Sequence, residues 1–89
     1  MQTHQFTIHT TQPVDDSLEA MVERIYGRCD DASAHGHTSG KLCVSFDRDA
    51  SNIDIAMRSA IADLRSVGCG IEKIVIDTNE LETLTAESV

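Results

Sequence analysis

The residues best suited to chemistry gather around a predicted hairpin in the middle of the chain. His35 and His37 are two positions apart, and Cys43 follows beyond the turn signal Thr38-Ser39-Gly40. Residues two apart on a strand share a face, so these side chains could converge on a soft divalent metal such as zinc, with His9 one or two strands away. We therefore take His35, His37 and Cys43 as candidate metal ligands. The competing interpretation is that they are exposed polar residues on an open sheet face, which a His-x-His pattern gives more often.

No catalytic constellation accompanies this cluster. Cys43 could act as a nucleophile with a histidine as base, but nothing supplies a helix N-terminus for a thiolate or an oxyanion site. The acidic segments Asp30-Asp31 and Asp47-Arg48-Asp49 fall where helix and strand meet, where carboxylates usually cap helices or pair with an arginine such as Arg48. A phosphate loop, a Ser-His-Asp order and a dinucleotide fingerprint are all missing. We predict a protein without enzymatic activity, catalytic residues or cofactor.

Composition narrows the classes of partner. The 89 residues carry a formal net charge of -8, which repels phosphate backbones and argues against direct binding of nucleic acid. The three cysteines are odd in number and lack CxxC spacing, which is typical of reduced thiols, so we expect a cytoplasmic protein. No apolar run approaches the roughly 20 residues of a membrane span, and we expect no membrane association.

Alternation and helical spacing divide the first part of the chain. Phe6 and Ile8 alternate with polar residues, which predicts a half-buried strand closed by Pro13. Capping carboxylates then precede apolar residues at helical spacing, which predicts a helix to about Arg28. Its apolar positions are Val14, Leu18, Met21, Val22, Ile25 and Cys29.

The hairpin from 32 to 47 has two possible registers. A two-residue turn at Ser39-Gly40 would pair His35 with Val44 and bury both histidines of the hairpin. A three-residue turn, with Gly40 in the left-handed conformation, shifts the register by one and turns Ala32 and Ala34 inward. We prefer the second register, because the first would bury two imidazoles without partners.

The rest of the chain predicts one more helix and one more strand. Ser51 or Asn52 caps a helix whose apolar stripe runs from Ile53 to Val67, and the last strand covers 71–77. Together these elements predict an α+β domain of ferredoxin-like β-α-β-β-α-β topology, with two helices on one face of a four-stranded antiparallel sheet. We place this domain at 1–78 and a polar C-terminal tail at 79–89.

Several short strings resemble a family of short, largely uncharacterised bacterial proteins. They are Phe46-Asp47-Arg48-Asp49-Ala50-Ser51, then Ser59-Ala60-Ile61-Ala62-Asp63-Leu64 with Gly68, and Cys29-Asp30-Asp31-Ala32 before the hairpin. The resemblance covers about 6–80. In that family the domain is often followed by a predicted helix-turn-helix segment, and members are commonly labelled DNA-binding on that basis. We expect that segment to be missing here, so the resemblance implies the dimerisation or sensory half of such an architecture.

Function is expected on the sheet face that the helices do not cover. The face would display Gln5, Thr7, His9, His35, His37, Cys43, Ser45, Lys73 and Val75. We expect a small regulatory or protein-interaction module that forms a homodimer through the sheet and could also bind another protein. The alternative is a sensor domain that binds a metal or a small molecule on the same face.

Overall fold

The computed structural model describes residues 2–16, 18–37 and 39–76, and these form four strands and two helices. In chain order the elements are β1 (Gln2–Pro13), α1 (Leu18–Arg28), β2 (Ala32–Gly36), β3 (Lys41–Ala50), α2 (Ile53–Ser66) and β4 (Ile71–Ile76). The predicted α+β class, with a four-stranded antiparallel sheet and two helices, is confirmed. The predicted tail at 79–89, and the domain boundary at 78, lie outside the described residues.

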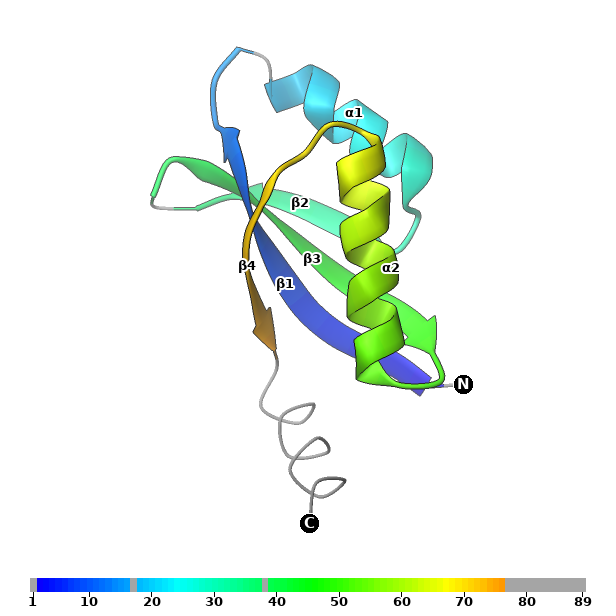
Figure 1. The fold of residues 1–89 in the computed structure, drawn as a ribbon. Helices are drawn as coiled ribbons and strands as arrows, with labels where there is room; N and C mark the ends of the chain where they lie inside the picture. Colours follow the sequence, from blue (N-terminus) through cyan, green and yellow to red (C-terminus); the bar gives the residue numbers. More distant parts are fainter. Residues whose placement is uncertain (1, 17, 38, 77–89) are drawn as a thin grey trace.

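The sheet has the strand order β2-β3-β1-β4, and each neighbouring pair is antiparallel. The long strand β1 lies in the middle, between β3 and β4. Figure 1 shows both helices on the same side of the sheet. The described segments thus leave the second face of the sheet without a covering element. Neither helix is long and apolar enough to span a membrane within this described part.

The core lies between the sheet and the helices. Phe6 and Ile8 of β1 point into it beside Val44 and Phe46 of β3, and the rings of Phe6 and Phe46 stack with centroids 5.4 Å apart. Helix α2 contributes the buried residues Ile53, Ala56, Ala60 and Leu64, and helix α1 contributes Met21 and Ile25. The inward residues alternate along β1 and β3, as the sequence predicts for a half-buried sheet. In β4 a shift of register opposite His9 and Thr10 interrupts the alternation between Ile71 and Ile74.

The helix starts refine the prediction. Helix α1 begins at Leu18, and Val14 is not one of its core positions, because the Val14 N–H donates to the carbonyl of Gly40 at 2.9 Å and the side chain is exposed. The inclusion of Val14 in the helical stripe was wrong. Of the two candidate caps of α2, Asn52 is the N-cap, since its side-chain oxygen accepts the Ile55 N–H at 2.8 Å.

The hairpin takes the three-residue register. Ala34 pairs with Val44 and His35 pairs with Cys43, while the His37 N–H donates to the carbonyl of Lys41 at 2.9 Å. Gly40 has φ +83°, a left-handed conformation that costs glycine little. The preferred register is therefore confirmed, and both hairpin histidines stay out of the core.

One cation holds the sheet to its neighbours on the covered side. Arg48 of β3 donates from Nε and Nη2 to the two carboxylate oxygens of Asp31 at 2.7 and 3.0 Å, and from Nη1 to Asp63 of α2 at 2.9 Å. Its guanidinium lies 5.0 Å from the centroid of the Phe46 ring, and its side chain is only 12% exposed. The three strings that carry the family resemblance thus meet at one arginine. The expectation that these junction carboxylates pair with Arg48 is confirmed for Asp31.

The Arg48 network gives a first test, in which Arg48→Ala is compared with Arg58→Ala. The first change leaves Asp31 and Asp63 without their partner in a partly desolvated place, and we expect a loss of about 2–3 kcal/mol in the free energy of unfolding. Arg58 pairs with Asp54 on the exposed side of α2, so its loss should cost less than about 0.5 kcal/mol. Urea unfolding at pH 7 measures both, and equal losses would contradict the assignment.

The same network has a pH signature. The hydrogen bonds from Arg48 hold the pKa of Asp31 below its ordinary value. The contribution of ionised Asp31 to the free energy of unfolding is therefore complete above the pKa of about 4 that an aspartate has in the unfolded chain. This contribution is lost as the pH falls through the lower pKa that Asp31 has in the folded state.

Candidate functional site

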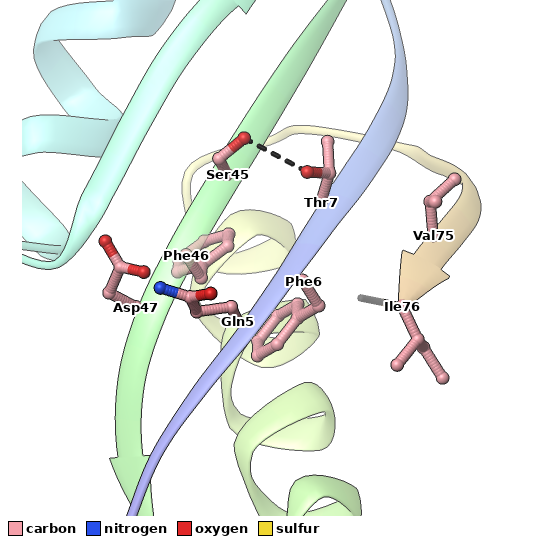
Figure 2. A pocket seen from close by; sticks show the side chains of 8 residues that line it. All are labelled: Gln5, Phe6, Thr7, Ser45, Phe46, Asp47, Val75 and Ile76. Atoms are coloured by element: carbon pink, nitrogen blue, oxygen red, sulfur yellow. Dashed lines mark hydrogen bonds between the residues drawn. The ribbon is translucent and has the colours of Figure 1, made fainter. Parts of the chain in front are cut away.

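The uncovered face of the sheet, which we call the open face, has a central row of small side chains. Thr7 of β1 pairs with Ser45 of β3 on one side and with Val75 of β4 on the other. The Thr7 and Ser45 hydroxyls are 3.0 Å apart and share a hydrogen bond, which Figure 2 marks with a dashed line. One hydroxyl donates to the other, which leaves the O–H of the accepting hydroxyl for a further partner. The side chains of this row are uncharged and short, so another protein surface can approach the sheet closely here.

A shallow hollow of about 330 Å³ lies around this row. It is lined by Gln5, Phe6, Thr7, Ser45, Phe46, Asp47, Val75 and Ile76, drawn in Figure 2. Val75 stands at its border, is 47% exposed and adds an apolar side chain to the edge of the hollow. An exposed apolar group beside a hollow is the feature of this face that most resembles a contact surface.

The next row toward the hairpin holds a histidine and a thiol in contact. His9 of β1 pairs with Cys43 and with Lys73, and the His9 Nδ1 lies 3.4 Å from the Cys43 Sγ. The ring of His37 meets the ring of His9 edge to face at a centroid distance of 5.0 Å. Cys43 is only 1% exposed, so the expectation that the open face displays this thiol was wrong. It belongs to the open face by register but lies beneath its neighbours.

The electrostatics of this row favour neutral groups. Burial raises the pKa of the Cys43 thiol, and the carboxylate of Glu72 raises it further. Burial also lowers the pKa of His9, and Lys73 and His37 lower it in the same direction. A catalytic cysteine and histidine need the opposite shifts, toward a thiolate and an imidazolium. The contact between His9 and Cys43 is therefore a hydrogen bond between neutral side chains.

The predicted metal ligands are only partly brought together. His35 pairs with Cys43 across the hairpin but is exposed, and His37 lies nearer to His9. The Nδ1 of His37 accepts the Ser39 N–H at 3.2 Å, which occupies one ring nitrogen within its own turn. Within the part of the chain that the structure describes, no group of three or more His, Cys, Asp or Glu side chains is arranged to hold a metal ion. The set of His35, His37 and Cys43 stays a prediction.

Sequence reasoning missed Asp47 as an open-face residue and treated it only as part of a junction. Asp47 pairs with Gln5 and is exposed on the same face as Ser45 and Cys43. The signal was available, because the alternation that places Cys43 and Ser45 outward continues to Asp47. The strand β3 runs to Ala50, three residues further than the predicted hairpin.

No protein-family model, curated protein or solved structure matches the chain. The resemblance to short bacterial proteins therefore remains a prediction from the quoted strings.

The His9 pair predicts a pH dependence of stability. Because the pKa of His9 is lowered on folding, the folded state prefers the neutral side chain. The contribution of neutral His9 to the free energy of unfolding is complete above the unfolded pKa of about 6.5 and is lost as the pH falls below that value. We expect His9→Gln to flatten the rise in unfolding free energy between about pH 5 and 7, measured in urea. His35→Gln, on the exposed neighbour, is the control and should keep the rise. If both variants keep it, His9 does not carry the dependence.

Proposed function

We propose that this chain is a non-enzymatic interaction module that self-associates through the open face of its sheet. The strand order β2-β3-β1-β4, antiparallel throughout, supports the ferredoxin-like topology for it. In this topology both helices cover one face and the other is available for a partner. The observation that carries the proposal is the exposed Val75 beside the hollow and the small central row of Thr7 and Ser45.

A second copy is the partner that this face fits best. A two-fold dimer requires a surface that is complementary to itself. The open face carries both an apolar projection, Val75, and a hollow beside it. In a two-fold dimer, Val75 of each copy can therefore contact the hollow of the other. Covering the face also removes apolar surface from water, which a small domain with a limited core needs.

The chemistry of the face supports a binding role over a catalytic one. The thiol of Cys43 is buried and its raised pKa keeps it protonated, and the lowered pKa of His9 keeps that side chain neutral at pH 7. The hydroxyls of Thr7 and Ser45 bond to each other rather than to a base. These groups offer shape and hydrogen bonds to a partner, and no activated nucleophile.

Dimerisation is tested with Val75→Lys and its matched control Ile55→Lys. Val75 and Ile55 are exposed to nearly the same extent, 47% and 48%, but Ile55 lies on α2, away from the open face. We expect the wild type and Ile55→Lys to form the same dimer, and Val75→Lys to associate at least about tenfold more weakly. The reason is that a two-fold dimer buries Val75 of both copies in its interface, whereas Ile55 stays outside it. Sedimentation equilibrium over the micromolar range measures all three. A monomer at high micromolar concentration refutes the proposal.

The alternative function is a sensor that binds a small molecule or metal on the same face. The volume of the hollow favours it, because about 330 Å³ falls at the lower end of the range for ligand sites. Native mass spectrometry of untagged protein purified without chelators separates the two functions. We expect a dimer mass without adduct, and a stoichiometric adduct of zinc or of a small molecule would favour the sensor.

A further inference from the structure

The open face carries two opposite charges in symmetric places about its centre. Lys73 of β4 and Asp47 of β3 lie on either side of Thr7. Each is one strand across and two residues along from Thr7, in opposite directions, because His9 pairs with Lys73 while Gln5 pairs with Asp47. With strands about 4.8 Å apart and about 3.4 Å per residue, each charge is roughly 8 Å from Thr7 along one diagonal.

Both charges are available to a partner. Lys73 and Asp47 are exposed, and neither forms an ion pair with another residue in the described ranges. The other lysine near this end, Lys41, already pairs with Glu72 at 3.1 Å. Between the two charges lie only the small row and the hollow, so a flat partner could reach both.

Resting on the self-association proposed above, we infer that the dimer is ordered by this diagonal, with Lys73 of each copy over Asp47 of the other. The two-fold axis lies in the interface, passes over Thr7 and runs perpendicular to the diagonal. Rotation about it exchanges the two ends of the diagonal, so two identical ion pairs form. The strands of the two sheets then cross steeply, as in the orthogonal class of sheet packing.

The same rotation also seats the apolar projection. Val75 lies one strand from Thr7, and the rotation brings it over the space between Thr7 and Gln5 of the other copy. Those two residues line the hollow. Charge pairing and apolar contact therefore require the same orientation, which is the consistency that a specific interface needs.

The test uses two charge reversals, Asp47→Lys and Lys73→Asp. Alone, each variant places like charges together at both ends of the diagonal, and we expect its dimer to be at least about tenfold weaker than the wild type. Mixed together, the two variants regain both ion pairs, because the first carries a lysine at each end of the diagonal and the second carries an aspartate at each end. We expect a heterodimer within about threefold of wild-type affinity, measured by sedimentation or native mass spectrometry of the mixture.

The controls are Glu23→Lys and Arg24→Asp on the exposed side of α1, which make the same changes in net charge away from the open face. They should dimerise like the wild type, alone and mixed. A wild-type protein that stays monomeric would overturn the self-association itself. If the wild type dimerises but the two charge-reversal variants associate normally, or do not favour the heterodimer when mixed, the ion pairs along the diagonal are contradicted. The self-association itself would then still hold.

Discussion

The register between β2 and β3 is the constraint that sorts the residues of the hairpin between the core and the open face. Gly40 allows the chain to turn in three residues, and this places Ala32 and Ala34 under the helices, with His35 across from Cys43 on the other side. Side chains alternate with a period of two, so a slip of one residue would exchange the two faces of β2. The partly buried alanines and the exposed imidazoles therefore stabilise one register together. Because β3 pairs with both β2 and β1, an error in the register of β3 would weaken the whole sheet.

Arg48 fixes the side of β3 that faces the helices. It neutralises Asp31, which leads into β2, and Asp63, which belongs to α2, while its guanidinium lies over the ring of Phe46. A cation that joins three elements orders them more than an apolar residue would, since its partners must come to defined positions. The strings that resemble the bacterial family contain these partners. Their occurrence together in this chain thus has a structural reason that requires no chemistry on the open face.

The strands and helices were predictable because their patterns are local. Phe6 and Ile8 alternate, Asn52 and its helix follow a capping rule, and Gly40 marks its turn. What escaped prediction depends on the pairing of distant strands. The contact between His9 and Cys43 exists because β1 inserts between β3 and β4, and the burial of Cys43 depends on the neighbours that this brings. Val14 was misplaced for the same reason, since its backbone partner Gly40 lies far along the chain, beyond α1 and β2.

The distribution of charge bears on which surface two copies can share. Each helix carries as many basic as acidic residues: Glu19 and Glu23 stand against Arg24 and Arg28 on α1, and Asp54 and Asp63 against Arg58 and Arg65 on α2. The helices therefore offer no net charge that would orient a partner copy. On the open face the opposite charges of Lys73 and Asp47 lie at the two ends of one diagonal, and the row between them is neutral. An orientation that places each charge over its opposite satisfies both pairs, so this diagonal, rather than the net charge of the chain, selects the contact.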